Sequence, residues 1–526
     1  ARLPARTAAV LAGALGVANV ATGPLAASGL APPWLVAAVS VTTLAALAWL
    51  LAGQPRVALG AVAAALPFNY GLALRLAGRP ISPVELLVAL AVAGRAAAWC
   101  AASANRPPRL PDEAAVGPAP TLRRAADPLG RSLDALAAGL AVWATLSIAW
   151  SEHRAPALYQ WRTVIVEPLV YYALLRTAAD RRAAAQAAAD GLVLGGAVAA
   201  VWGLAGVAAA LAGVSVAGLS GVSAEGVVRA LGPYGSPNNL ALFLGRVAAV
   251  IAAYVVFGGT GMDGVRGPNN TCRRAYALAG IPIAAALVAT FSRGLIVAGV
   301  PALALTFVAV SGRRARRALA GAVATLAVVA VLLAPFAGTP RVRDTFRLEP
   351  GTTLYIRVRL WQSAVEMARD HPWLGVGLDN FLYHYRDVYV RRDVIQDGSL
   401  NHPHNWLLDW WTRLGLPGLV VWLALALGNA RAGRRAVRAW DRRTTVARAR
   451  ADGSPQTPAS AAADAAAGSP LAVAALGMQV YAVAHGLVDN SFFLVDLAAV
   501  WWIGQAALLA AADDGADDAA YGQPHL

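Results

Sequence analysis

The sequence predicts an all-α polytopic integral membrane protein with about 12–14 transmembrane helices and one long helical loop outside the bilayer. Of 526 residues, 58% are hydrophobic and 14% are charged, and the mean hydropathy is +0.54, outside the range of ordinary soluble domains. Apolar runs of roughly 20 residues recur along most of the chain. They are continuous blocks of Ala, Leu, Val and Gly, which favours helices over the alternating strands of a membrane barrel.

Fourteen apolar segments are interpreted as membrane spans. In chain order they lie near residues 8–29, 34–52, 57–76, 82–101, 133–150, 159–177, 189–213, 238–257, 276–291, 295–311, 318–337, 416–429, 471–488 and 493–511. They predict four parts: residues 1–132 with N-terminal transmembrane helices and a cytoplasmic linker, 133–337 with central transmembrane helices, 338–415 as an extracytoplasmic loop, and 416–526 with C-terminal transmembrane helices and a cytoplasmic tail.

The basic residues predict the orientation of the chain in the membrane. All 44 Lys and Arg positions are arginines, and they concentrate in the loops that are cytoplasmic if both termini face the cytoplasm. The net charge of +15 is therefore interpreted as anchoring to membrane lipids, and no nucleic-acid partner is expected. Cys100 and Cys272 fall on the same side, lack the spacing of metal ligands, and are expected to be packing residues.

The long loop at 338–415 is the first candidate functional region, because a loop of that length in a compact bundle is usually functional. Within it, helical periodicity over residues 355–370 places Arg359 on a polar face and Arg357 in the middle of the apolar face. A charge in that position has two interpretations. It is either a functional group that points into the protein or an arginine whose stem covers apolar surface.

A second unusual charge is Arg293, the one ionisable residue in the apolar run 276–311. The run is too long for one membrane helix and short for two, so "SRG" predicts either a tight outer turn or a helix broken at membrane depth. An arginine in a membrane span is by default a functional hypothesis, and the alternative is a turn residue at the headgroup level. Together, Arg293 and Arg357 favour an anionic ligand such as a diphosphate, because guanidinium groups match phosphate oxygens and stay charged.

Two histidines lie in "NHPHNWLLDWW", residues 401–411, where a polar stretch meets an apolar one. Pro403 restricts His402 to extended geometry, and a helix can begin after His404. A neutral imidazole at His404 can accept a proton from a sugar hydroxyl near neutral pH. A capping or supporting role is favoured for His402. A zinc site that uses both histidines, with His384 as a third ligand, is the weaker alternative.

Several further residues have two interpretations each. Arg162 and Glu167 form an internal ion pair or belong to a donor cavity, and the first is favoured. Asp489 either orients His404 or an acceptor hydroxyl, or caps the helix that follows. The cluster of Trp406, Trp410 and Trp411 is interpreted as an interfacial belt, with sugar stacking as the second possibility.

An ordered set of motifs between about residue 130 and 500 resembles the O-antigen ligase and O-antigen polymerase superfamily. The motifs are "SPNN" (236–239), "FSRG" (291–294), "RVRLW" (357–361), "HPWLGVGLDNF" (371–381), "HPHNWLLDWWTRLGLPG" (402–418) and "HGLVDN" (485–490). The resemblance implies a GT-C-like bacterial enzyme of the cytoplasmic (inner) membrane that transfers glycan from undecaprenyl diphosphate on the periplasmic or outer face. It also implies an inverting reaction without a metal or another cofactor.

By the same resemblance, Arg293 and Arg357 bind the diphosphate and His404 is the catalytic residue. Residues in or near the motifs are supporting candidates: His402, Asn405, Asp489, Arg162 and Asn238. The expected partners are the lipid-linked glycan donor, a glycan or lipid A-core acceptor, and membrane lipids. Arg413 stands where many members carry an acidic residue, and fourteen spans exceed the usual dozen, so the acceptor stays open.

Three alternatives to a ligase are kept. A polymerase would extend the glycan on its lipid carrier, and a protein O-oligosaccharyltransferase would use a protein acceptor. A transporter of polysaccharide or lipid-linked sugar belongs to a different class and can also use arginines within the membrane. A transporter is expected to show related halves or paired broken helices, and the sequence shows one "SRG" break.

Overall fold

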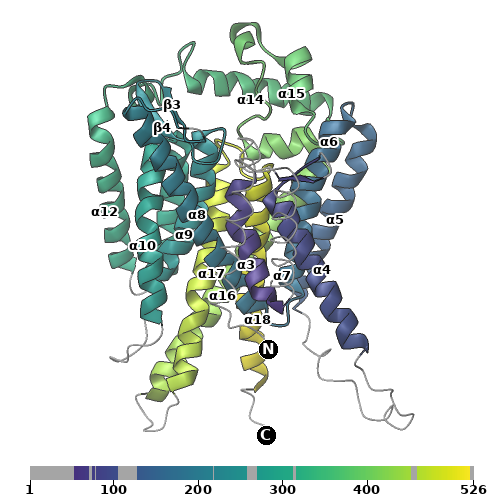
Figure 1. Ribbon diagram of the computed structural model, residues 1–526, viewed down its shortest axis with the longest axis vertical. Helices are drawn as coiled ribbons and strands as arrows, with labels where there is room; N and C mark the ends of the chain where they lie inside the picture. Colours follow the sequence, from purple (N-terminus) through teal and green to yellow (C-terminus); the bar gives the residue numbers. More distant parts are fainter. Residues whose placement is uncertain are drawn as a thin grey trace, which may run out of the picture.

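A computed structural model shows a bundle of long helices with a cap of shorter elements at one end, the upper end in Figure 1. The structure describes residues 53–69, 74–76, 79–104, 127–216, 218–257, 269–311, 315–451 and 459–521. The predicted spans at 8–29 and 34–52 and most of the linker before residue 127 lie outside the described residues. The division of the chain into four parts stays a prediction.

The first half of the described chain contains nine α-helices and two short hairpins. They are α3 (Pro55–Ala65), the 3₁₀ turn η1 (Leu66–Phe68), β1 (Leu74–Leu76), β2 (Arg79–Ile81), α4 (Pro83–Ala104), α5 (Pro128–Trp150), α6 (Arg154–Gln160), the π-helical η4 (Trp161–Val166), α7 (Glu167–Arg176), α8 (Arg181–Leu211), β3 (Gly221–Ala224), β4 (Val227–Ala230), α9 (Pro237–Phe257), α10 (Asn269–Ala289), the π-helical η5 (Leu295–Gly299) and α11 (Val300–Val310). In both hairpins the two strands are antiparallel.

The second half of the described chain contains the cap and the last helices of the bundle. It runs through α12 (Ala315–Leu333), η7 (Ala334–Phe336), α13 (Pro340–Arg343), α14 (Thr353–Asp370), α15 (Phe381–His384), η8 (Tyr385–Tyr389), η9 (Arg392–Asp397), α16 (Trp406–Ala451), α17 (Ala459–His485) and α18 (Val495–Tyr521). The stretch from α13 to η9 and the β3–β4 hairpin lie at the upper end of the bundle (Figure 1).

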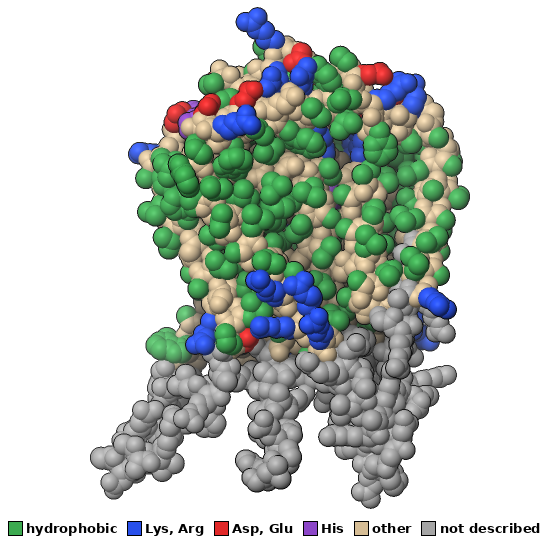
Figure 2. Space-filling view, turned by 180° about the vertical axis from the view of Figure 1, so that it is seen from behind, with side chains coloured by type: hydrophobic (Ala, Val, Ile, Leu, Met, Phe, Trp, Pro, Cys, Tyr) green, Lys and Arg blue, Asp and Glu red, His purple; other side chains and the backbone are tan. Residues whose placement is uncertain are grey.

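Seven helices within the described ranges are long and apolar enough to cross a membrane, and three shorter ones are similarly apolar. Figure 2 shows one face of this bundle, which has an apolar band with charged side chains gathered above and below it. Such a surface suits the hydrocarbon core of a bilayer. The prediction of an all-α polytopic membrane protein is confirmed.

Four predicted spans differ from what the described residues show. Those over 159–177 and 276–291 fall on α7 and α10, which are not among the apolar helices counted above. The span expected over 57–76 ends as a helix at Phe68, because Pro67 cannot continue the hydrogen-bond ladder, and the short hairpin β1–β2 follows. The span expected over 416–429 is part of the much longer α16. A kink at Gly415, with φ 66° and ψ −172°, divides α16, and the stretch long and apolar enough to cross a membrane, Trp406–Ala439, includes this kink.

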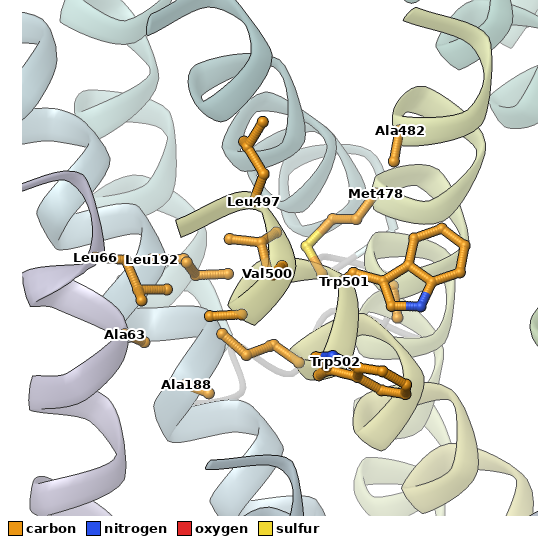
Figure 3. Close-up of a cluster of buried hydrophobic side chains, with 14 of the residues drawn as sticks. Ala63, Leu66, Ala188, Leu192, Met478, Ala482, Leu497, Val500, Trp501 and Trp502 are labelled. Atoms are coloured by element: carbon orange, nitrogen blue, oxygen red, sulfur yellow. The ribbon is translucent and has the colours of Figure 1, made fainter. Parts of the chain in front are cut away.

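The bundle core lies where α17 and α18 meet α3, α8 and α9. Figure 3 shows Leu497, Val500 and Trp501 of α18 beside Met478 of α17 and Leu192 of α8. Small residues such as Ala line most of these helices, so their backbones approach closely, as is typical of packing between membrane helices.

The tryptophans that begin α16 belong to the same core. Trp410 is fully buried and its ring lies against Trp422 and Phe493, while Trp406 lies 4.1 Å from Trp422 between ring centroids. The interpretation of this cluster as an interfacial belt is therefore wrong for both residues. They face the other helices of the bundle and not the headgroups.

The cap is attached to α16 at its kink. The backbone nitrogen of Val376 donates to the carbonyl of Thr412 (2.7 Å), and that of Gly377 donates to the carbonyl of Arg413 (3.0 Å). These bonds satisfy carbonyls that the kink frees from the helical ladder. They also fix the height of the cap above the helices.

Gly375 is the residue that permits this contact, and Gly375→Ala is expected to destabilise the protein. Its φ is +67°, and a Cβ there would lie 2.6 Å from the carbonyl oxygen of Thr412. Left-handed strain plus the backbone clash is expected to cost about 1–3 kcal/mol. Thermal unfolding of the purified protein should show a lower Tm. Gly338→Ala is the matched control, because open space surrounds that glycine, and equal Tm values for both variants would contradict the prediction.

Candidate functional site

Helix α14 carries the two arginines that the helical pattern distinguished. The Thr352 hydroxyl caps the helix by accepting from the nitrogen of Tyr355 (3.4 Å), and residues such as Leu360 are buried on its inner face. Arg357 lies on that inner face and is 15% exposed, whereas Arg359 points outward and pairs with Asp393 at 2.7 Å. The positions of both side chains agree with the helical pattern, and the role of Arg357 as a ligand stays a prediction.

His404 lies in the loop between η9 and α16. Asn405 accepts from the nitrogen of Leu407 (3.0 Å) at the start of α16, and its amide donates to the carbonyl of Leu487 (3.0 Å). The nitrogen of Trp406 donates to the carbonyl of Gly486 (2.8 Å). The histidine loop is therefore fastened to the segment between α17 and α18. His404 itself has φ +50°, a conformation that non-glycine residues adopt rarely.

Asp489 comes from that second segment and meets His404 directly. Its Oδ1 lies 2.7 Å from Nδ1 of His404, and its Oδ2 lies 3.4 Å from Nη2 of Arg357. Nε2 of His402 lies 3.2 Å from Nδ1 of His404 and 4.0 Å from Asp489. Asp489 is 3% exposed, and α18 begins only at Val495, so the geometry favours orientation of His404 over helix capping.

The electrostatics of this group favour a neutral histidine beside an ionised aspartate. Burial and the neighbouring His402 lower the pKa of His404 to about 4, and Asp489 offsets this only partly. Burial alone would raise the pKa of Asp489, but His404 and Arg357 together hold it well below its usual range. With Nδ1 of His404 engaged by Asp489, Nε2 is the nitrogen that remains to accept a proton.

Arg293 lies in a tight turn between α10 and η5, so the first interpretation of "SRG" describes the structure. Phe291 turns the chain with φ +46°. Gly294 follows, and a Cβ on it would lie 2.5 Å from Nε2 of His485 in α17, so the turn needs glycine there. The turn therefore lies against the last turn of α17, four residues before Asp489.

The guanidinium of Arg293 contacts three elements of the cap. Nη2 pairs with Oε2 of Glu225 at 2.6 Å, and Nη1 donates to Oγ1 of Thr353 at 2.6 Å. Nε and Nη2 both donate to the carbonyl of Arg341 (3.2 and 2.9 Å). Thr353 and Arg357 are four residues apart in α14, so they share a face and lie about 6 Å apart along the helix axis. The two predicted diphosphate-binding arginines therefore meet the same face of α14.

Three charged residues of this site were missed by sequence reasoning: Glu225, Arg229 and Arg341. Arg341 donates twice to the carbonyl of Phe291 and lies 3.5 Å from Glu225. Arg229 donates to the carbonyl of Thr290 (2.7 Å). Glu225 was the detectable one, as the lone acidic residue in "GVSAEGVV", a stretch with the small residues of a hairpin. The two arginines had no distinguishing local signal.

The other supporting candidates fall into two groups. Asn238 accepts from Nη2 of Arg229 (2.8 Å) and so borders the arginine cluster. Arg162 pairs with Glu85 and, at 3.4 Å, with Glu167, as the internal ion-pair interpretation predicted. His384 lies 3.7 Å from Glu152 at another part of the cap, so the suggestion that it completes a zinc site with His402 and His404 is wrong.

Arg413, the residue that departs from the family pattern, is buried behind the histidine loop. Its guanidinium pairs with Asp409 at 2.6 Å, donates to Gln160 at 2.8 Å and donates to the carbonyl of Asn401 at 3.2 Å. The last of these bonds ends directly before His402. Arg413 therefore supports the loop from behind and makes no contact with His404 among the described residues.

One group in the described ranges has the ligand chemistry of a metal site. The ligand atoms of His402, His404 and Asp489 all lie within 4.8 Å of one another. Two imidazoles and a carboxylate suit zinc. Arg357 already supplies a positive charge to Asp489, however, and this disfavours a divalent cation beside it. We interpret the group as a hydrogen-bonded site for proton transfer.

A family model described as O-antigen ligase matches residues 278–423. This segment contains Arg293, Arg357 and His404, whereas Glu225 and Asp489 lie outside it. The match confirms the resemblance that the sequence motifs indicated, and it supports, in general terms, a function of the O-antigen ligase or polymerase type. No curated protein matches the chain.

Proposed function

We propose, from the O-antigen ligase domain that the chain carries at residues 278–423, that the protein is an inverting glycosyltransferase of the O-antigen ligase type. In this proposal it transfers a glycan from undecaprenyl diphosphate to an acceptor hydroxyl. The site lies at the end of the bundle that carries α14, and the distribution of arginines supports assigning that end to the outer face of the cytoplasmic membrane.

The observation that carries the proposal is the contact of 2.7 Å between Nδ1 of His404 and Asp489, with Arg357 on the other carboxylate oxygen. This arrangement fixes one tautomer of the imidazole and leaves Nε2 as a base. Positive charge lies beside it at Arg357, and Arg357 in turn interacts electrostatically with Arg341. A proton acceptor next to an excess of arginine suits attack by a hydroxyl on a sugar whose leaving group is a diphosphate.

In the proposed reaction, the acceptor hydroxyl attacks the anomeric carbon and forms the new carbon–oxygen bond. Nε2 of His404 takes the hydroxyl proton, and the imidazolium that forms is stabilised by Asp489. The bond from the anomeric carbon to the phosphate oxygen breaks, and its electron pair leaves with undecaprenyl diphosphate. Arg293 and Arg357 stabilise the charge that grows on that oxygen. A single displacement inverts the anomeric centre.

Reconstitution with a defined donor tests this function. The purified protein is mixed with undecaprenyl-diphosphate oligosaccharide and candidate acceptors, with and without a chelator, and the glycan is followed by mass spectrometry. Glycan on lipid A-core or another non-carrier acceptor supports a ligase. A longer glycan that is still on undecaprenyl diphosphate supports a polymerase. Unchanged donor with folded, donor-binding protein would contradict transfer and favour transport.

The proposed base predicts an unusual pH dependence. Only neutral His404 accepts a proton, and its lowered pKa means that half of it stays neutral down to pH about 4. Transfer is therefore expected to persist through pH about 6.5, where an ordinary histidine is half protonated, and to fall as pH approaches about 4. Between pH about 6.5 and about 4 the unfolded chain binds more protons than the native protein. The stability of the native protein is therefore also expected to fall as the pH is lowered through that range.

Initial rates of transfer against pH, with thermal unfolding measured at each pH, check this prediction. A midpoint near pH 6.5 in protein that is still folded would contradict a buried neutral histidine. Because the Asp489 charge raises the pKa of His404, residual activity in Asp489→Asn should have its acid midpoint at still lower pH.

A further inference from the structure

The β3–β4 hairpin places a carboxylate inside the arginine site. Glu225 and Gly226 form its turn, with φ values of +50° and +81°, and the backbone carbonyl of Glu225 accepts from the nitrogen of Arg341 (3.2 Å). Figure 1 shows this hairpin at the same end of the bundle as α14. The turn is thereby held over Arg293 and Arg341 and not over the membrane-facing surface.

The Glu225 carboxylate is held as an anionic ligand would be. Oε2 lies 2.6 Å from Nη2 of Arg293 and 3.5 Å from Nη1 of Arg341, and Oε1 accepts from the Thr353 hydroxyl at 3.3 Å. Two guanidiniums and a hydroxyl around two oxygens also suit one phosphate group. Glu225 keeps 34% of its side chain exposed, whereas Arg341 is 7% exposed. The carboxylate can therefore move toward solvent while the arginines stay in place.

The site also carries more positive charge than the protein neutralises. Four arginines interact electrostatically across it: Arg229, Arg293, Arg341 and Arg357. Against them stand Glu225 and Asp489, while Asp344, which also interacts with Arg293, is paired with Arg343. Four positive charges less two negative ones leave an excess of two once the Asp344–Arg343 pair is set aside as neutral. Burial and the nearby Arg293 lower the pKa of Arg341 to about 10, which leaves it charged at neutral pH. The excess positive charge stabilises an incoming dianion more strongly than it stabilises the single negative charge of one carboxylate.

We propose that Glu225 occupies a phosphate position of the donor site and exchanges with the diphosphate, leaving when the donor binds and returning when undecaprenyl diphosphate departs. This inference rests on the proposed function. In that reaction the exchange would aid product release. Undecaprenyl diphosphate carries more negative charge after transfer than the glycosylated donor does, so the same arginines would otherwise hold it more tightly. Glu225 thus determines affinity for the diphosphate and favours its release.

Binding of inorganic diphosphate to the full-length protein in detergent, measured by isothermal titration without magnesium, tests the exchange. Glu225→Gln removes the competing charge and keeps the length of the side chain, so we expect binding about ten-fold tighter. Glu225→Asn should show the same direction, because asparagine tolerates positive φ. Glu349→Gln is the matched control. It removes one charge from the same cap, but Glu349 is exposed and pairs only loosely with Arg347 at 3.9 Å.

Unchanged or weaker binding in both Glu225 variants would overturn the proposal, because it would make Glu225 a residue that merely orients Arg293. Equally tight binding in Glu349→Gln would also overturn it, as a general charge effect. Transfer from the lipid-linked donor is measured separately. If the Glu225 variants bind diphosphate more tightly but neither they nor the wild type transfer glycan, the glycosyltransferase proposal is contradicted and the anion exchange is supported. If the wild type transfers glycan but diphosphate binding is unchanged in the Glu225 variants, the glycosyltransferase proposal is supported and the anion exchange is contradicted.

Discussion

His404→Asn is expected to reduce the rate of glycan transfer by about 10²–10⁴-fold, with little change in the KM for the donor. Asparagine tolerates the left-handed conformation of this residue, where φ is +50°, better than alanine does, and its amide can still donate to Asp489. The variant therefore keeps the loop and loses only the proton acceptor at Nε2. Single-turnover transfer with saturating lipid-linked donor measures the effect on the chemical step.

The control for this variant is His371→Ala. His371 lies at the end of α14 with its ring 5.8 Å from that of His384, away from Asp489 and the arginines. Transfer by His371→Ala should stay within a few-fold of wild type. If His404→Asn retains near wild-type transfer while it stays folded, His404 is not the base. His402 then becomes the next candidate, because its Nε2 lies 3.2 Å from Nδ1 of His404.

Asp489→Asn separates orientation from proton transfer at the same dyad. The substitution keeps the volume and removes the charge that stabilises the imidazolium formed in the reaction. We expect a loss in the same range, about 10²–10⁴-fold, and a double variant with His404→Asn that is little worse than either single one. Additive losses would mean that the two residues act independently, against the contact of 2.7 Å between them.

Local periodicity was enough to predict one part of this site. Residues 355–370 form a helix with a polar and an apolar side, so the inward position of Arg357 followed from counting 100° per residue. The length of the apolar run indicated a break at "SRG", because about 36 residues cannot cross the bilayer as one helix or comfortably as two, but it did not decide between a tight turn and a broken helix. Both inferences use patterns that lie within one continuous stretch of fewer than forty residues.

The partners of these residues are distant in sequence, so sequence reasoning could name His404 only as one of several possible partners of Asp489 and did not find Glu225 at all. Asp489 is 85 residues from His404, and Glu225 is 68 residues from Arg293. The motif "HGLVDN" could not decide between contact with His404 and a capping role for its aspartate, since that depends on how α17 and α18 pack beside α16. The interpretation of Trp410 as an interfacial residue was wrong for the same reason. A tryptophan near a helix start suits the headgroup region, but the neighbouring helices bury this one.

Arg357→Ala is expected to reduce kcat/KM for the donor by about 10²–10³-fold, whereas Arg359→Ala should stay within a few-fold of wild type. The two arginines are two residues apart in one helix, carry the same charge and differ in direction. Arg357 donates to the carbonyl of Val488 and meets Asp489, while Arg359 pairs with Asp393 on the outer side and is 32% exposed. Transfer kinetics at several donor concentrations compare them directly.

Loss of Arg357 also leaves Asp489 buried without its counter-charge, so a fall in activity has two possible causes. A broken buried pair of this kind typically costs about 3–5 kcal/mol, which would appear as a lower Tm. Arg357→Gln paired with Asp489→Asn removes both charges at once and should recover the Tm. If donor affinity recovers with it, Arg357 served only to neutralise Asp489. If KM for the donor stays high in the folded double variant, the guanidinium itself holds the diphosphate, which is the outcome we expect because charge on phosphate needs a positive partner that an amide does not supply.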